Sequence, residues 1–224
     1  MPAKPYDLLI FDWDGTLSDS AQLIVSTMQQ AISGLSLAPR EDGQIRELIG
    51  LGLADGMGRL YPEMDTPTLL ALLENFRRNW MKSAGTAPAE APLFHAADSV
   101  LQALHAQGFA LGIATGKSRA GLKRSLAVHS HIRPLFASTR TADETANKPD
   151  PLMLSEILAE LGVPAERALM IGDTEYDAEM ARAIGMPMLG VACGVHDAGR
   201  IRAAKAVAVI DSVADLPRWL SAGG

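Results

Sequence analysis

The sequence predicts an α/β protein: a Rossmann-like parallel sheet with helices on both faces, plus a helical cap inserted after the first strand. Short apolar runs typical of buried strands alternate with segments that have the three- and four-residue spacing of helices. This alternation is typical of a parallel sheet that is covered on both faces. The stretch 18–92 interrupts it, because that stretch has helical spacing and contains no candidate strand.

The first candidate strand is the short apolar run before Asp12, which is followed by Asp-Gly-Thr, a turn signal. Runs of the same kind predict further strands at 109–114, 136–140, 168–171, 187–192 and 206–210, the run at 136–140 being the weakest. Helical patterns lie between these runs, and several of them end at a glycine, as helices commonly do. The strands are therefore expected to be parallel and joined by helices.

The interruption after the first strand has the pattern of a separate helical unit. Two apolar stripes at helical spacing mark it: Ile24, Met28, Ala31 and Leu35, then Leu69, Leu72, Leu73, Phe76 and Trp80. The chain returns through a linker at 85–92 that is rich in Ala, Pro and Gly. We therefore expect a discontinuous core, 1–17 and 93–224, and a helical cap, 18–92.

The composition indicates a protein that binds neither nucleic acid nor membranes. The chain has 224 residues, a net charge of −6 and no run of Lys and Arg that could follow a phosphate backbone. No apolar run approaches the roughly 18 residues of a membrane span, and the N-terminus lacks the pattern of a signal peptide. The one cysteine, Cys193, excludes an intramolecular disulfide. We therefore expect a cytoplasmic protein, and both a monomer and a homodimer stay open.

Polar side chains follow four of the predicted strands, at the edge where parallel strands end. Ligands of open parallel sheets bind at this edge. The polar residues fall in four groups along the chain: Asp12, Asp14, Gly15 and Thr16; Thr115, Gly116 and Lys117; Lys148 and Pro149; and Asp173 and Asp177. We expect these groups to converge at one site.

The residue types in these groups indicate phosphoryl chemistry at a magnesium ion. Asp12 and Asp173 offer the hard oxygen ligands that Mg²⁺ prefers, and clustered carboxylates repel one another unless a cation lies between them. Lys148 adds a compact positive charge. The hydroxyl of Thr115 and nearby backbone N–H groups can hold phosphate oxygens, especially if a helix begins just beyond them. Asp12 and Asp14 form a pair in which one carboxylate can attack while the other handles the proton.

In this order, the motifs Asp-x-Asp-Gly-Thr, Thr-Gly, Lys-Pro and Gly-Asp-x-x-x-Asp resemble those of the haloacid dehalogenase superfamily of aspartate-nucleophile phosphotransferases. The motifs span Asp12 to Asp177, and the core-plus-cap layout covers nearly the whole chain. A helical cap after the first motif is similar to the subgroup that contains phosphoglycolate phosphatase, pyrophosphatases and β-phosphoglucomutase. True dehalogenases lack the second aspartate of the first motif, so Asp14 favours phosphoryl chemistry.

The resemblance implies a role for each matching residue. Asp12 would attack phosphorus and form an aspartyl-phosphate, while Asp14 would protonate the leaving group and then activate water. The phosphoryl group would be bound by Thr115, Gly116 and Lys148. The implied metal ligands are Asp12, Asp173 and the carbonyl of Asp14, with Asp177 supporting Asp173 or Lys148.

The implied function is that of a Mg²⁺-dependent phosphatase acting on a small phosphorylated metabolite, such as a phosphoglycolate-like compound or a sugar phosphate. A phosphomutase of the β-phosphoglucomutase type or a pyrophosphatase would use the same core site and stays an alternative. A non-enzymatic phosphoacceptor, like the receiver domains of bacterial signalling, is disfavoured because such domains are much shorter and have no helical cap.

Other segments have both a functional and a structural interpretation. The loop Gly50–Gly56 either faces the site or is a plain turn between helices, and Arg46 beside it is a candidate substrate contact. Asp177 also suits the first turn of a helix, where the dipole favours an acid. The basic stretch 117–124 has the pattern of a solvated helix face.

Overall fold

The computed structural model describes residues 4–82 and 90–223 of the chain. These residues form one sheet in the order β3-β2-β1-β4-β5-β6, with all neighbouring strands parallel. The strands are β1 (Leu8–Phe11), β2 (Ala110–Thr115), β3 (Phe136–Thr141), β4 (Ala168–Gly172), β5 (Met188–Val191) and β6 (Ala208–Ile210). The predicted fold class is confirmed, including the weak strand at 136–140.

The first strand of the chain lies in the middle of the sheet and is buried on both faces. Leu9 and Phe11 belong to one apolar cluster, whereas Leu8 and Ile10 belong to the other, and all four side chains are inaccessible to solvent. Successive side chains of a strand point to opposite faces, so a strand covered on both sides has to be apolar throughout. The continuous apolar run before Asp12 is explained by this position.

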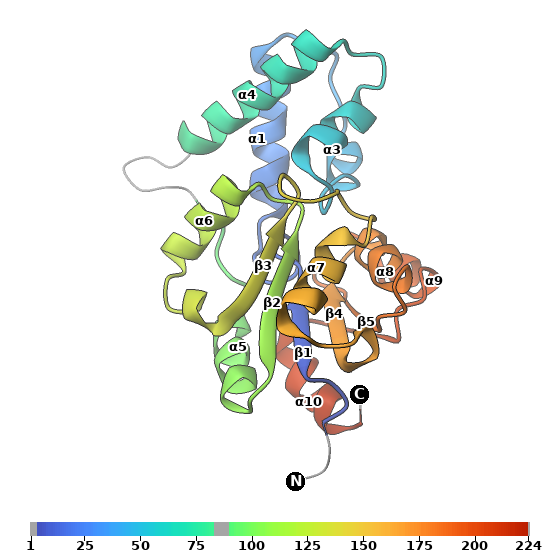
Figure 1. Cartoon of the computed structure of the whole chain (residues 1–224). Coiled ribbons are helices and arrows are strands. Elements are labelled where there is room, and N and C mark those ends of the chain that lie inside the picture. The colour runs from blue at the N-terminus through green and yellow to red at the C-terminus, as the bar shows by residue number, and fades with distance from the viewer. Residues whose placement is uncertain (1–3, 83–89, 224) are drawn as a thin grey trace.

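Helices cover both faces of the sheet (Figure 1). The helices of the core are α5 (Ala97–Ala106), α6 (Arg119–Val128), α7 (Leu152–Leu161), α8 (Glu175–Arg182), α9 (Ala198–Ala203) and α10 (Leu216–Ser221), with 3-10 turns η1 (Arg133–Leu135), η2 (Ala165–Arg167) and η3 (Val213–Asp215). Helices α5, α6 and α10 contribute to the apolar cluster on one face, and α7, α8 and α9 to that on the other. None of the described helices combines the length and the apolarity that crossing a membrane requires.

The cap is a helical unit with an apolar core of its own. Its helices are α1 (Ala21–Gly34), α2 (Asp42–Arg46), α3 (Leu53–Leu60) and α4 (Thr66–Lys82). Side chains from all four helices, among them Met28, Ile45, Met57 and Phe76, form a third buried cluster. Figure 1 shows these helices gathered above one end of the sheet. Of the predicted return linker at 85–92, residues 85–89 lie outside the described residues.

The chain enters and leaves the cap at one place. The N–H of Asp19 donates to the carbonyl of Pro92 at 2.9 Å, and the N–H of Phe94 donates to the carbonyl of Leu17 at 2.9 Å. Ser18 and Leu93 pair there as an antiparallel bridge. The two connecting segments are therefore hydrogen-bonded to each other, and they attach the cap to the core side by side.

Replacing Ile10 by alanine is expected to lower the free energy of unfolding by about 2–5 kcal/mol, because it leaves a cavity in the middle of the sheet. Leu70→Ala is the matched control, since Leu70 is 58% exposed on α4 and its truncation should stay within about 0.5 kcal/mol of the wild type. Urea denaturation followed by circular dichroism measures both values. Equal losses of unfolding free energy in the two variants would contradict a core centred on β1.

Candidate active site

The strand ends bring the residues predicted from the four motifs together. Asp12 follows β1, Thr115 ends β2, Asp173 follows β4, and Lys148 comes from the loop between β3 and α7. These four side chains are at most 1% exposed. They belong to segments up to 161 residues apart along the chain, from Asp12 to Asp173, and they meet because parallel strands end at a common edge.

Lys148 lies between two buried carboxylates. Its Nζ is 2.9 Å from Oδ1 of Asp12 and donates to Oδ1 of Asp177 at 2.7 Å, with the side chains of all three residues at most 1% exposed. Burial by itself lowers the pKa of Lys148, but the charges of Asp12 and Asp177 outweigh it and hold the pKa above its usual value. The ammonium is therefore a permanent positive charge beside Asp12.

Asp177 has both of the roles considered for it. Besides accepting from Lys148, its Oδ2 accepts from the backbone N–H and the hydroxyl of Thr174, at 3.2 and 2.7 Å. Thr174 and Asp177 thereby form the capping box of α8. The carboxylate that supports Lys148 is thus held in place by the start of a helix.

Asp173 is held by hydrogen bonds to both of its oxygens. Its Oδ1 accepts from the hydroxyl of Thr16 at 2.8 Å, and its Oδ2 accepts from the backbone N–H of Val195 at 2.9 Å. Glycines make room for this side chain: a Cβ built on Gly15 or on Gly194 would lie 2.2 or 2.0 Å from Oδ2 of Asp173. Gly15 also has a φ of +84°, which favours glycine.

The carboxylates of Asp12, Asp173 and Asp177 fit a divalent cation. Each offers an oxygen, and these oxygens lie within 4.8 Å of one another. Apart from the ion pair with Lys148, neither oxygen of Asp12 has a polar partner among the described residues, although both oxygens are buried. If all three carboxylates are ionised, Lys148 balances only one of three negative charges, so two remain. A buried, uncompensated charge of this kind is costly without a cation, and carboxylate oxygens suit Mg²⁺.

The pKa values of two of these carboxyls respond to the surplus negative charge. Burial raises the pKa of Asp12 well above its ordinary value, and the neighbouring charges of Asp177 and Asp173 raise it further against the opposing effect of Lys148. Burial, followed by the charge of Asp177, raises the pKa of Asp173 to about 7. A proton therefore competes for the position of a cation at neutral pH.

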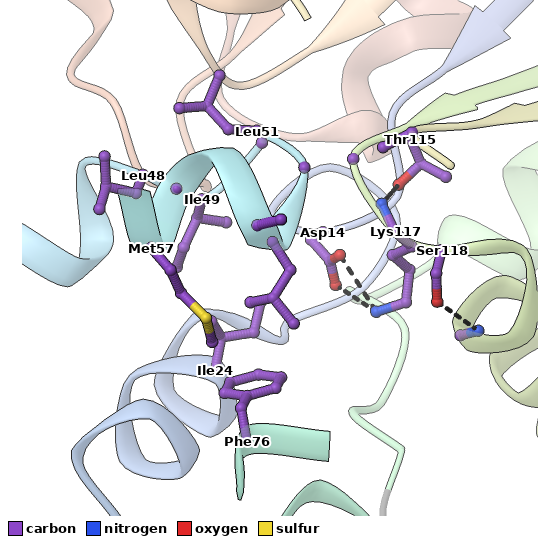
Figure 2. A pocket seen from close by; sticks show the side chains of 18 of the residues that line it. Asp14, Ile24, Leu48, Ile49, Leu51, Met57, Phe76, Thr115, Lys117 and Ser118 are labelled. Carbon is purple, nitrogen blue, oxygen red and sulfur yellow. Dashed lines mark hydrogen bonds and ion pairs between the residues drawn. The ribbon is translucent and has the colours of Figure 1, made fainter. Parts of the chain in front are cut away.

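Asp14 lies apart from this cluster and is held by different partners. The hydroxyl of Ser20 donates to its Oδ1 at 2.6 Å, and Nζ of Lys117 lies 2.9 and 3.1 Å from its two oxygens (Figure 2). The same Nζ is 5.3 Å from the ring centroid of Trp80 on α4. The sequence interpretation did not predict this contact with Asp14. It includes Lys117 in the polar group that ends the second strand but gives it no role, and it assigns the basic stretch that begins with Lys117 to a solvated helix face. The position of Lys117 directly after the Thr-Gly motif was the one available signal.

The Thr-Gly motif faces the cap. A Cβ on Gly116 would lie 2.5 Å from the carbonyl oxygen of Leu51 and 2.6 Å from that of Gly50, so only glycine admits this approach of the cap backbone. The hydroxyl of Thr115 accepts from the N–H of Lys117 at 3.2 Å. The expected helix does not begin directly after this motif: α6 begins at Arg119 with Ser118 as its N-cap.

The cap and the core enclose a cavity of about 320 Å³. Asp12, Asp14 and Thr115 line it from the core. The loop Gly50–Gly56 lines it from the cap, so this segment faces the site and also joins α2 to α3. Arg46 is not among the described residues that line the cavity, and its guanidinium donates to the side chain of Gln22. A substrate contact by Arg46 therefore has no support from the geometry of this structure.

Comparisons with known proteins agree with this geometry. The family described as haloacid dehalogenase-like hydrolase matches residues 9–191. A phosphoglycolate phosphatase from Rhodospirillum rubrum is 30% identical over 221 residues, which cover 95% of this chain and 90% of that protein. A phosphoglycolate phosphatase from Salmonella typhimurium is 30% identical over 233 residues, covering 92% of this chain and 89% of that protein.

A solved structure supports the same relationship. A haloacid dehalogenase-like hydrolase from Bacteroides fragilis superposes with a TM-score of 0.85 at 26% identity, covering 94% of this chain and 99% of that one. The similarity extends over core and cap together.

Magnesium is expected to stabilise the protein more at pH 8 than at pH 5.5. In the metal-free protein Asp173 has a pKa of about 7 against an ordinary 3.8, so protonation favours the folded state. That contribution is complete below about pH 4 and is lost as the pH rises through about 7. The ion binds the ionised carboxylate, so it stabilises most where the proton has left.

Thermal melting in EDTA and in excess MgCl₂, at matched ionic strength, measures this difference in melting temperature. Asp173→Asn should show little response to magnesium at either pH. A magnesium response of the wild type that is equal at pH 5.5 and pH 8 would argue against ligation by Asp173.

Proposed function

The chain belongs to the haloacid dehalogenase-like hydrolase family and is a phosphatase of that family, and on this basis we propose that it hydrolyses a small phosphate monoester through an aspartyl-phosphate at Asp12. The observation that carries the proposal is the Asp12 carboxylate. It lies at the cavity, and the ammonium of Lys148, 2.9 Å from its Oδ1, is its one polar side-chain partner among the described residues.

In the first step, a carboxylate oxygen of Asp12 attacks phosphorus while the bond between phosphorus and the alcohol oxygen breaks. The alcohol oxygen takes a proton from the carboxyl of Asp14, which lines the same cavity. Lys148 offsets the negative charge brought together by carboxylate and phosphate. The hydroxyl of Thr115 and the N–H of Gly116 are the proposed donors to the phosphoryl oxygens.

In the second step, water attacks the phosphorus of the aspartyl-phosphate and passes a proton to the carboxylate of Asp14. The P–O bond to Asp12 breaks, which releases inorganic phosphate and restores the carboxylate of Asp12 and the protonated carboxyl of Asp14. Two displacements, each with a lower activation barrier, thereby replace one very slow reaction. The same aspartate serves in turn as acid and as base.

We propose that Asp12, Asp173 and the carbonyl of Asp14 hold a Mg²⁺ ion, with Asp177 acting through Lys148. When bound, such an ion neutralises charge on the phosphoryl oxygens. The three buried carboxylates and the charge that Lys148 leaves uncompensated support this assignment. The nucleophile and the acid–base group then line one cavity, and the fixed positive charge of Lys148 lies beside the nucleophile.

We propose further that residues 18–92 act as a cap that excludes water during the reaction. Contacts between cap and core support this: Nδ2 of Asn147, the residue before Lys148, donates to Oδ2 of Asp55 on α3 at 2.7 Å. The hydroxyl of Tyr176 donates to the carbonyl of Glu47 at 2.9 Å. Excluding bulk water strengthens the charge interactions inside the cavity, while the single attacking water of the second step is admitted.

Replacing Asp12 by asparagine is expected to lower kcat for p-nitrophenyl phosphate at least about a thousandfold, because the amide is not a nucleophile. The exposed Asp211 offers the matched control, since Asp211→Asn should retain wild-type turnover. Circular dichroism should show both variants folded. Acid quenching of the wild type during turnover, followed by mass spectrometry, should locate one phosphoryl group on Asp12.

Wild-type turnover by a folded Asp12→Asn variant would overturn the proposed nucleophile. Detection of the phosphoryl group on another residue would overturn it as well. A wild type that is phosphorylated once and does not turn over would instead identify a phosphoacceptor.

Lys117 is proposed as a positioning residue for Asp14. Lys117→Met should lower kcat about tenfold or more with an alkyl phosphate, whose leaving group needs the proton from Asp14, and much less with p-nitrophenyl phosphate, whose leaving group does not. Lys117→Arg should restore part of the loss, and Lys123→Met, an exposed change on the following helix α6, should have no effect. Equal losses on both substrates would indicate a purely structural role for Lys117.

A further inference from the structure

The cavity has a polar side and an apolar side. The core supplies the reacting carboxylates and the Thr-Gly motif, whereas the cap supplies aliphatic and aromatic side chains (Figure 2). The most prominent of these are Ile24, Leu48, Ile49, Met57, Leu73 and Phe76. They come from α1, α3, α4 and the segment before α3, so the apolar wall belongs to the cap as a whole.

Almost no charge faces the cavity from the cap. Among the described lining residues of helices α1–α4 and their connecting loops, Arg77 carries the one charged side chain, and that residue is exposed to solvent. Two cations of the core also line the cavity. Lys117 is paired with Asp14, whereas Nε of Arg124 lies 3.8 Å from Oε1 of Glu90 and has no hydrogen-bond partner among the described residues.

Glu90 adds a negative charge to the same wall. Its side chain is 4% exposed, and one of its oxygens accepts from the hydroxyl of Ser125 at 2.6 Å. A second anionic group on the substrate would therefore meet a buried carboxylate and apolar side chains over most of the wall. The cations that line the cavity beside this wall are Arg124, which lies next to Glu90, and the exposed Arg77. Burying an unpaired charge in such surroundings is strongly unfavourable.

From this two-sided cavity, we infer that the substrate is the phosphate monoester of a small apolar alcohol, with a branched alkyl or aryl group against the cap. The inference rests on the proposed function and narrows its substrate class. Phosphoglycolate brings a carboxylate to the position of the apolar wall, and a sugar phosphate brings several hydroxyls. The aliphatic and aromatic side chains that make up most of this wall offer no hydrogen-bond partner to either group, so burying it against them is unfavourable.

The size of the cavity limits the apolar group. An apolar cavity of about 150 Å³ takes a benzene molecule, so about 320 Å³ has room for a group of that size beside the phosphate. Each additional buried methylene should raise kcat/KM about fourfold, which is ~0.8 kcal/mol converted at 1.4 kcal/mol per tenfold, until the wall is filled. The net reaction is ester plus water giving the free alcohol and inorganic phosphate, as in the two steps above.

Isobutyl phosphate and phosphoglycolate form a test pair of nearly equal shape, in which two methyl groups replace the two carboxylate oxygens. Phosphate release by the full-length protein with Mg²⁺ should give a kcat/KM at least about tenfold higher for isobutyl phosphate. Benzyl phosphate should be better still, and glucose 6-phosphate should be poor.

A pair of variants on α4 tests the role of the wall itself. Leu73 lines the cavity and is half-buried, while Leu70, one turn earlier, is 58% exposed. Leu73→Lys places a cation in the wall and should shift the ratio of kcat/KM from isobutyl phosphate toward phosphoglycolate by at least about tenfold. Leu70→Lys should leave the ratio unchanged.

The outcomes separate this inference from the proposed function. Efficient hydrolysis of phosphoglycolate or glucose 6-phosphate, in preference to isobutyl and benzyl phosphate, would overturn the apolar class and leave the phosphatase intact. An unchanged ratio in a folded Leu73→Lys variant would overturn the role of the wall. Failure of the wild type to hydrolyse any of these esters, p-nitrophenyl phosphate included, would overturn both proposals.

Discussion

The buried ammonium of Lys148 between Asp12 and Asp177 is the interaction on which the site depends. Without it, three carboxylates would lie within 4.8 Å of one another with no positive charge from the chain. The ammonium is held by the capping box of α8 on one side and by the end of β1 on the other. Breaking a buried ion pair by removing one partner is strongly unfavourable. The ion pairs of Lys148 therefore hold its loop against the sheet in addition to packing.

The same electrostatic arrangement divides the two aspartates of the first motif between different tasks. Asp12 lies with Lys148 and the carboxylate cluster, whereas Asp14 lies with Lys117 and Ser20. Two residues of separation are enough, because β1 ends at Phe11 and the chain bends at Trp13, between the two aspartates. In the proposed mechanism one carboxylate attacks phosphorus and the other serves the leaving group, each beside its own ammonium.

Much of the fold and the centre of the site could be predicted from the sequence because each depends on local pattern. The run before Asp12 is apolar at every position, which only a strand buried on both faces requires, and Asp173 follows another such run. Contacts between loops that are far apart in the sequence could not be predicted. Lys117 contacts Asp14, which lies 103 positions earlier in the sequence, and no local sequence pattern predicts a contact over such a separation. Gly194 was missed for the same reason. A side chain at position 194 would collide with Asp173, and this becomes visible only when the folded structure places Asp173 against it.

The place where the chain crosses between core and cap has an evolutionary consequence. Leu17 and Phe94 are bonded to each other there, as are Asp19 and Pro92, so the inserted segment begins and ends at one point on the sheet. Because the insert also has its own apolar interior, it can diverge without disturbing the strands that carry the reacting groups. Lineages of such a hydrolase can thus exchange one recognition module for another and inherit the phosphate chemistry unchanged.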